Sequence, residues 1–309
     1  MVKRIRPHRL APGDVIGIVA PAGPPSEAHL SLGIRYLEER GYHVEIGSHV
    51  LDRHGYLAGT DSERVADLHA MFRNPKIKAV VCARGGYGSQ RILTALDFGL
   101  IAKNPKILMG YSDITSLLVA VHRRTGLVVF HGPMAATDMG RGWFDQPGEE
   151  SWDLLTGRIP SAYRSSASIR IGPTANAAGR LIGGCLSLLN VLPGTPFAPH
   201  LRQHLLFIED IGEDPYKLDR MLTHLRLAGW FNQLAGLLVG SMARCVPADS
   251  EPSLTISEIL SDVVADYGIP VAGDFSFGHD SANPIMPIGI RAELNPREGT
   301  LRLLEQATE

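Results

Sequence analysis

A single serine, Ser112, stands between the apolar segment 106–110 and a stretch with helical periodicity. Apolar residues recur at helical spacing after it, at Ile114, Leu117, Leu118 and Val121, so the predicted order is strand, serine, helix. Such a turn exposes a hydroxyl at the end of a sheet, and the first N–H groups of the helix face whatever the oxygen attacks. Serine is also a favoured N-cap residue, so a simple helix cap explains the same position.

A serine nucleophile needs a base within hydrogen-bond reach, and the base needs a third group to orient it. Reactive groups in open α/β sheets collect at the carboxyl ends of strands, so useful histidines directly follow apolar runs. His279 does so, with Gly278 allowing the backbone to turn, and His131 does so before Gly132. Histidines inside predicted helices are expected to serve surface or packing roles: His29, His69, His122 and His224.

Glu209 ends the apolar run 205–208 and is a candidate to orient the histidine. A carboxylate here also fits the solvent-exposed end of a strand. Glu213, one short loop later, precedes a predicted helix and is equally suited to its N-terminus. The chain order Ser112, Glu209, His279 is one of several that catalytic triads adopt, so order alone does not identify a triad.

A glycine cluster at 83–88 follows the predicted strand 78–82. Its bare N–H groups can approach a developing negative charge closely, which makes it a candidate oxyanion hole for Ser112. Its spacing fits neither G-x-G-x-x-G nor G-x-x-x-x-G-K-[ST], which argues against a nucleotide-phosphate loop. A second cluster, 179–184, is too loose to name a nucleotide and is interpreted as a turn. No H-E-x-x-H or paired C-x-x-C occurs, so no catalytic metal is expected.

Composition narrows the class of protein. The 309 residues exceed the size at which one core usually stops growing, so two domains are expected. Thirty basic against 32 acidic residues argue against nucleic acid or an anionic membrane as a partner. The three cysteines, Cys82, Cys185 and Cys245, lack close pairing, which argues against a disulfide framework and against a zinc knuckle. No stretch approaches the roughly 18 apolar residues of a membrane span, so a cytoplasmic protein is predicted.

The first half alternates short apolar runs with helical periodicity, which predicts a βαβ series and a largely parallel sheet. A helix is expected over 26–40, and the spacing of Thr60 and Glu63 predicts a capping box at the start of another. Strands are predicted at 15–19, 43–46, 78–82, 106–110 and 128–131.

The second half follows a Gly-, Pro- and Ser-rich stretch, from Trp143 to Asn176, that is interpreted as an interdomain connection. The predicted division is an N-terminal α/β domain at 1–155, a linker at 156–175 and a C-terminal domain at 176–309. Strands are predicted at 205–208, 234–239 and 271–275, helices near 214–227 and 257–267, and a closing hairpin from 288–294 and 300–304.

Eight separated blocks occur in a fixed order along the chain: Gly13-Asp14 with Val19-Ala20-Pro21-Ala22-Gly23, Ala83-Arg84-Gly85-Gly86-Tyr87-Gly88, Gly110-Tyr111-Ser112-Asp113, His131-Gly132-Pro133, Gly183-Gly184-Cys185-Leu186-Ser187, Phe207-Ile208-Glu209-Asp210, Pro215-Tyr216-Lys217-Leu218-Asp219-Arg220, and Phe277-Gly278-His279. In this order they resemble the LD-carboxypeptidases, or muramoyltetrapeptide carboxypeptidases, which are serine peptidases of cell-wall recycling. The resemblance covers nearly the whole chain, and the series is more specific than any one block.

The resemblance implies a role for each matching residue. Ser112 would be the nucleophile, His279 the general base and Glu209 the group that orients the histidine, with Glu213 as the fallback if the block is offset. The family's oxyanion donors correspond to the N–H groups of Asp113 and Gly86.

A carboxypeptidase must also hold a free carboxylate. Arg84 is a candidate because a guanidinium pairs bidentately with a carboxylate, although a structural ion pair would explain this arginine equally well.

The resemblance also implies a fold and a reaction. The N-terminal domain would be Rossmann-like, of the flavodoxin-like parallel type, and the smaller C-terminal α/β domain would be of the swivelling β-barrel type. The implied reaction is hydrolysis, through an acyl-enzyme, of the L,D bond between a diamino acid such as meso-diaminopimelate and the terminal D-alanine of a murein tetrapeptide. A small muropeptide substrate, a homodimer and no cofactor are expected.

Two other functions remain open on the sequence. A related branch of the family resembles the microcin C immunity peptidases, which use the same triad to cleave aminoacyl-nucleotide analogues. A non-catalytic protein that binds a small ligand in a two-domain cleft is the alternative from another class.

Overall fold

The first sheet is built from the predicted βαβ series. The structure is a computed structural model that describes residues 3–142, 149–160, 162–166, 168–247, 252–280 and 283–309. The strands lie in the order β12-β5-β4-β3-β1-β2, and β1 to β5 are parallel. They are β1 (Val15–Val19), β2 (His43–Ile46), β3 (Ile77–Cys82), β4 (Ile107–Gly110), β5 (Val129–His131) and β12 (Met286–Ile288). This is the flavodoxin-like order, which places ligands beyond the strand ends where the order reverses, between β1 and β3.

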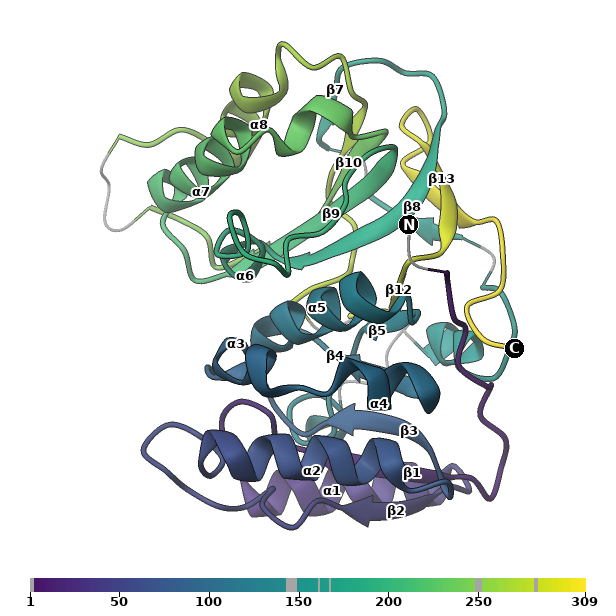
Figure 1. The fold of residues 1–309 in the computed structure, drawn as a ribbon. Helices are drawn as coiled ribbons and strands as arrows, with labels where there is room; N and C mark the ends of the chain where they lie inside the picture. The colour runs from purple at the N-terminus through teal and green to yellow at the C-terminus, as the bar shows by residue number, and fades with distance from the viewer. Residues whose placement is uncertain (1–2, 143–148, 161, 167, 248–251, 281–282) are drawn as a thin grey trace.

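Helices cover both faces of the first sheet (Figure 1). On one face α2 (Asp61–Arg73), α4 (Phe98–Lys103) and α5 (Thr115–Thr125) pack in sequence against one another, with the short α3 (Ser89–Ile92) between α2 and α5. On the other face α1 (Glu27–Glu39) packs on the 3-10 turn η3 (Met139–Arg141).

The helix boundaries in this half agree with the sequence signals. Ser26 precedes α1, and Arg40 and Gly41 follow it. Thr60 and Glu63 form both halves of the capping box that starts α2.

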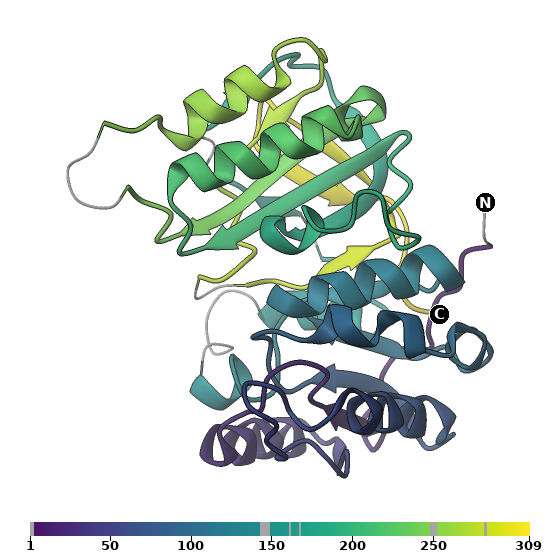
Figure 2. The same ribbon diagram turned by 60° about the vertical axis from the view of Figure 1, so that its left-hand side comes forward.

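The second sheet is mixed and has eight strands in the order β6-β14-β13-β8-β9-β10-β11-β7. The four strands β8 to β11 are parallel, and the flanking strands are antiparallel. They are β6 (Tyr163–Arg164), β7 (Arg170–Ile171), β8 (Ala177–Cys185), β9 (His204–Ile211), β10 (Gly236–Ala243), β11 (Val271–Ala272), β13 (Arg291–Asn295) and β14 (Thr300–Leu303). Figure 2 shows α7 (Pro215–Leu227) and α8 (Ile256–Val264) side by side over this sheet, and α6 (Leu186–Leu189) follows β8 directly. Shorter 3-10 segments complete the chain: η1 (Leu93–Ala95), η2 (Ser112–Ile114), η5 (Glu149–Leu154) and η6 (Trp230–Gln233).

The turn predicted at 179–184 is wrong, because these residues form the buried strand β8. Their glycines permit close approach of a neighbouring chain. A Cβ on Gly183 would lie 1.9 Å from the carbonyl oxygen of Phe207 on β9, and one on Gly184 would lie 2.6 Å from Thr115 at the start of α5. A glycine inside a strand often marks such a close contact, and a sequence does not distinguish this from a turn.

The closing hairpin begins later than predicted. Ile288 belongs to β12, which pairs antiparallel with β5 of the first sheet, whereas the hairpin strand β13 starts at Arg291. Gly289, with φ of 98°, separates the two strands and redirects the chain. The chain therefore returns to the first sheet after β11 and before it closes the second.

The predicted connection begins at Trp143, and 143–148 lie outside the described residues. Its described part contains η5, β6 and β7, and these two strands pair with β14 and β11 of the second sheet. The domain boundaries at 155 and 176 stay a prediction. None of the helices in the described ranges has the length and apolar character that a bilayer crossing requires.

Replacing Gly183 with alanine should lower the free energy of unfolding by about 3 kcal/mol, because the new methyl group would collide with the β9 backbone. Urea denaturation measures the change. Gly99→Ala is the matched control, since a Cβ at this helical site meets only the Asp97 carboxylate, at 3.1 Å, and should change stability by about 1 kcal/mol or less. Equal unfolding midpoints for the two variants would contradict the close packing of β8 on β9.

Candidate active site

Ser112 lies in the turn between β4 and α5, with a left-handed backbone φ of 62° that non-glycine residues rarely adopt. A strained turn of this kind is often found where a side chain must be presented at a functional site. Gly85 packs against it so closely that a Cβ there would lie 3.0 Å from Ser112 Cβ and 3.2 Å from its Oγ. Ser112 is half-buried, and the N-cap positions before η2 and α5 belong to Tyr111 and Ile114, so Ser112 is not the cap residue of this helix.

His279 lies on the segment that leaves β11 and returns to the first sheet as β12. Gly278 has φ of 122°, and a Cβ there would lie 2.8 Å from Glu209 Oε2. The Gly278 N–H donates to Asn283 Oδ1 at 3.0 Å, which holds the loop. Glycine is therefore required beside His279 both for the backbone angle and for the approach of the glutamate.

Three side chains that are far apart in the sequence form one chain of hydrogen bonds. His279 Nε2 lies 3.0 Å from Ser112 Oγ, and His279 Nδ1 lies 2.6 Å from Glu209 Oε2. Nδ1 must donate because a carboxylate oxygen only accepts, which leaves Nε2 of the neutral ring to accept from the serine hydroxyl. Among the described residues, the carboxylate bonded to His279 belongs to Glu209 and not to Glu213.

Glu209 lies inside β9 and is fully buried. The alternative of a solvent-exposed strand end is therefore wrong, because the strand continues through Ile211. Asp210, the next residue, has different partners: its carboxylate accepts hydrogen bonds from the N–H groups of Ser187 and Ile211, both at 2.8 Å. Alternation along the strand thus directs the two neighbouring carboxylates to different partners.

The surroundings of His279 favour its charged form. Burial by itself lowers the pKa of His279, but the hydrogen bond and charge of Glu209, followed by the charges of Asp210 and Asp138, raise it above the ordinary value. A base with a raised pKa accepts the serine proton more readily and is neutral, as catalysis needs, only at higher pH.

Tyr111 and Asp138 complete the surroundings of the histidine, and the sequence reasoning assigned neither of them. The Tyr111 ring packs edge-on at 4.9 Å from the His279 ring, and its hydroxyl donates to Asp138 Oδ1 at 3.1 Å. Burial raises the pKa of Asp138 to about 6. The signal for Asp138 in the sequence was an aspartate within the mostly apolar stretch 134–139, a position that favours a buried carboxylate.

His131, the other histidine considered, does not belong to the hydrogen-bonded series of Ser112, His279 and Glu209. It is fully buried beside Tyr111 and Phe207, with ring centroids at 5.7 and 5.5 Å. Burial, followed by the charge of His279, lowers the pKa of His131 to about 3, so its ring is neutral and serves packing.

The Asp113 side chain holds the 83–88 loop beside the serine. Its carboxylate accepts from the N–H groups of Gly88, at 3.3 Å, and Ser89, at 2.8 Å. Its backbone nitrogen would lie 3.4 Å from a Cβ on Gly85, so this N–H lies where the glycine loop meets the serine turn. In contrast, Gly86 is exposed, and the atoms nearest its Cβ position belong to Gly23 and Arg84. The contact with Ser112 thus runs through Gly85, and the oxyanion roles of Asp113 and Gly86 stay predictions.

Arg84 is exposed and directs its Nη1 to the carbonyl oxygen of Pro24, at 3.0 Å. The structural partner of this arginine is thus a backbone carbonyl of the loop that follows β1. A guanidinium has five N–H donors, so this one bond leaves most of its capacity for a ligand.

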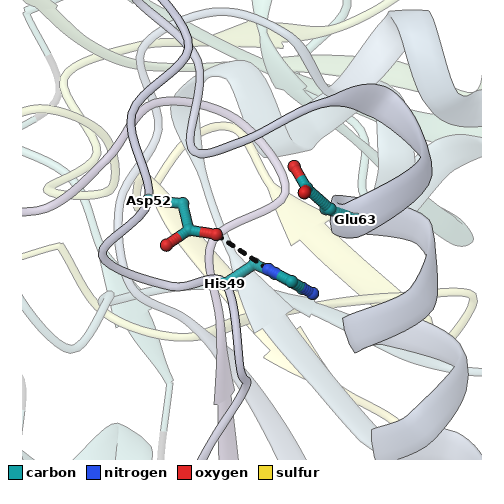
Figure 3. Close-up of side chains that lie close together, drawn as sticks. All are labelled: His49, Asp52 and Glu63. Atoms are coloured by element: carbon teal, nitrogen blue, oxygen red, sulfur yellow. Dashed lines mark hydrogen bonds and ion pairs between the residues drawn. The ribbon is translucent and has the colours of Figure 1, made fainter.

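A possible metal-ligand group is found elsewhere among the described residues. Figure 3 shows His49, Asp52 and Glu63, with the hydrogen bond from His49 to Asp52 dashed, at 2.8 Å. Glu63 Oε2 already accepts from the N–H and hydroxyl of Thr60, at 2.7 and 2.8 Å. The capping box and the histidine–aspartate pair account for this group without a metal.

The arrangement of Ser112, His279 and Glu209 suits acyl transfer. A base within 3.0 Å of the hydroxyl can remove its proton, and the buried carboxylate stabilises the imidazolium that forms. The loops after β1 and β3 meet beside the serine, where Gly23 N–H donates to the Gly85 carbonyl at 3.1 Å. The site therefore lies at the point where the strand order reverses.

Comparison with known proteins identifies the same two-part organisation. The chain matches the LD-carboxypeptidase N-terminal domain over residues 16–132 and the LD-carboxypeptidase C-terminal domain over residues 178–294. It is 44% identical over 297 residues to the probable murein peptide carboxypeptidase of Bacillus subtilis (strain 168), covering 96% of this chain and 93% of that protein. The crystal structure of muramoyltetrapeptide carboxypeptidase from Oxalobacter formigenes superposes with a TM-score of 0.83 at 32% identity, covering 94% of this chain and 97% of that chain.

A relative with a different named role also matches. The microcin C7 self-immunity protein MccF of Escherichia coli is 27% identical over 330 residues, covering 96% of this chain and 95% of that protein. These matches confirm the predicted fold class and the family resemblance.

Replacing Glu209 with glutamine should lower the pKa of His279, because the substitution removes the charge that favours the imidazolium. The pKa is measured by NMR titration of the His279 ring signals. Glu213→Gln removes the same charge from a residue not bonded to His279 and should leave its pKa unchanged. A shift with Glu213→Gln and none with Glu209→Gln would reverse the assignment of the orienting carboxylate.

Proposed function

Because the chain belongs to the LD-carboxypeptidase family, we propose that it is a serine carboxypeptidase that releases the terminal D-alanine of murein tetrapeptides. The scissile bond joins the L-centre of a diamino acid, such as meso-diaminopimelate, to D-alanine. The observation that carries the proposal is the hydrogen-bonded series Ser112, His279, Glu209, since a family match by itself does not show that a chain retains catalytic groups.

The proposed reaction proceeds through an acyl-enzyme. His279 Nε2 takes the proton of Ser112, and Oγ attacks the carbonyl carbon of the diamino acid. The N–H groups of Asp113 and of the glycine loop, with Gly86 as the predicted donor, stabilise the oxyanion. The imidazolium returns the proton to the leaving D-alanine amine, and water then hydrolyses the ester with His279 again as base.

Arg84 is proposed to bind the free carboxylate of the terminal D-alanine. It precedes Gly85, which packs on Ser112, and it is exposed with donors available beyond its bond to Pro24. The homodimer and the role in cell-wall recycling that the family implies belong to the same proposal.

Ser112→Ala should reduce D-alanine release from tetrapeptide by roughly 10⁴-fold or more, because the covalent step is lost. Release is measured by mass spectrometry under single-turnover conditions, with the pentapeptide as the substrate control. Ser116→Ala is the matched variant, because Ser116 lies on α5 with its hydroxyl bonded to Gln90, at 3.2 Å, and should retain activity.

An aminoacyl sulfamoyl adenosine is tested in parallel, to distinguish the proposed murein peptidase activity from the alternative of an immunity-type peptidase that cleaves aminoacyl-nucleotide analogues. Its turnover by the wild-type protein, without turnover of tetrapeptide, would replace the proposed substrate while keeping the triad. Full tetrapeptide turnover by Ser112→Ala would overturn the nucleophile itself.

Arg84→Gln should raise KM for the tetrapeptide by about 10-fold with little change in kcat, because a charged hydrogen bond to the bound substrate is lost in ground state and transition state alike. The same substitution should have no effect on a tetrapeptide with a C-terminal amide, measured in the same assay. Arg91→Gln, which removes an exposed guanidinium paired with Asp61, is the control. An equal loss on acid and amide would show that Arg84 does not read the carboxylate.

A further inference from the structure

A cavity of about 130 Å³ lies at the C-terminal end of α5, whereas Ser112 lies just before the N-terminal end of the same helix. A larger cleft of about 970 Å³ adjoins it, since Arg180, Pro199, His200 and His204 line both. We call the smaller cavity and the adjoining cleft together the basic pocket.

The lining of the basic pocket is strongly cationic. It includes five arginines and three histidines, from the N-terminal segment, the end of α5, β8, the loop before β9, the first residue of β9 and the start of β13: Arg4, Arg123, Arg180, Arg202, Arg291, His122, His200 and His204. No aspartate or glutamate is among the described residues that line it. The chain as a whole is slightly acidic, so this is a local concentration of positive charge.

Part of this charge is neutralised from outside the pocket. Glu305 pairs with Arg4, Arg6 and Arg180. Arg123 donates from Nε to the Ala198 carbonyl at 3.2 Å, a bond that does not neutralise its charge. Arg202 and Arg291 are exposed. Positive charge therefore remains in excess on the wall of the pocket.

Helix electrostatics explain only some of these residues. The last turn of α5 contains His122, Arg123 and Arg124, as expected where carbonyl groups give a helix end partial negative charge. Arg180 on β8 lines both parts of the pocket, whereas Arg202, before β9, and Arg291, at the start of β13, line the larger cleft. The end of α5 gives no reason for these three arginines to gather there, and a bound anion would account for them.

The histidines are kept neutral while the pocket holds no anion. Burial is the largest influence on His122, and with the charges of His204, Arg180 and Arg4 it lowers the pKa of this ring to about 4. The hydrogen bond with the Leu127 carbonyl acts in the opposite direction. Burial and the charges of Arg180 and His200 lower the pKa of His204, whose bonds to backbone carbonyls act in the opposite direction. Burial and the charge of Arg123 lower the pKa of His200. A bound anion would reverse this effect of the positive neighbours.

We propose that the basic pocket binds the phosphate group of a small phosphorylated molecule. A dianion can bond to several guanidinium groups at once, whereas a single carboxylate is satisfied by one bidentate arginine. The smaller cavity holds the phosphate, and the adjoining cleft, with Gln203 and Gln233 on its wall, holds the remainder of the molecule. Nothing in this argument depends on the triad, so the two functions can fail separately.

Isothermal titration calorimetry tests the proposal with inorganic phosphate, glucose 6-phosphate and glucose, at ionic strength held constant with chloride. Wild type should bind both phosphates saturably and glucose not at all. Arg123→Gln and Arg202→Gln should each weaken glucose 6-phosphate binding by about 10-fold or more. The exposed Arg202 keeps the test usable if Arg123→Gln disturbs folding.

Arg124→Gln is the matched control, because it removes the same charge from the same turn of α5 while Arg124 instead packs over the Phe98 ring. It should bind like wild type. Non-saturable heats, or an equal loss in Arg124→Gln, would reduce the pocket to a general cationic surface and overturn the proposal.

Discussion

The hydrogen bond between His279 Nε2 and Ser112 Oγ is the contact on which the candidate chemistry depends, because its two ends are positioned by different sheets. Ser112 is fixed by the turn after β4, whereas the imidazole is oriented by Glu209 on β9. The separation of 3.0 Å thus reports how the sheets pack. A misplacement of about 1 Å in such a contact can reduce a rate by about 100-fold. The two sheets are fastened close to this point, where the Cys185 N–H at the end of β8 donates to Thr115 Oγ1 at 3.1 Å.

Burying the Glu209 carboxylate costs folding free energy, but the buried charge serves the candidate site. A carboxylate in a low-dielectric interior is unfavourable unless it is paired, and its pairing here is the His279 ring, which becomes positive when the serine proton is taken. The charge that opposes folding is therefore the charge that stabilises the reacting state. Gly278 is required for this arrangement, since any larger residue would displace the carboxylate from the histidine.

Local signals in the sequence were sufficient for the parallel strands β1 to β5 and for the helices α1, α2 and α5. β1 and β2 have the predicted bounds, and the α2 capping box is present, because apolar periodicity and capping depend on neighbouring residues. β8 was missed because its glycines are set by contacts with β9 and α5, which are distant in sequence. Ile288 was assigned to the wrong strand for a similar reason, since its partner Val129 lies 159 residues earlier.

The sequence indicated which residues form the candidate site, but it did not indicate their geometry. Ser112, Glu209 and His279 each follow or end an apolar run, which placed them at strand ends, and the family pattern selected them together. The backbone angle at Ser112, the depth of Glu209 and the contact of Tyr111 with His279 arise only when the two sheets meet. The structure thus separates Glu209 from Glu213 by a contact that no local pattern contains.

Helix α5 separates the Ser112 turn, before its N-terminal end, from the basic pocket at its C-terminal end. Its 11 residues span roughly 16 Å, so the basic pocket at its C-terminal end lies well away from Ser112. The polarity of the helix suits each end differently, because the N-terminal N–H groups favour a developing oxyanion and the C-terminal carbonyl groups favour cations. The arginines from β8, the loop before β9 and β13 that line the adjoining cleft exceed what those carbonyl groups require. Their excess charge is the feature that the proposed phosphate site explains and an ordinary helix terminus does not.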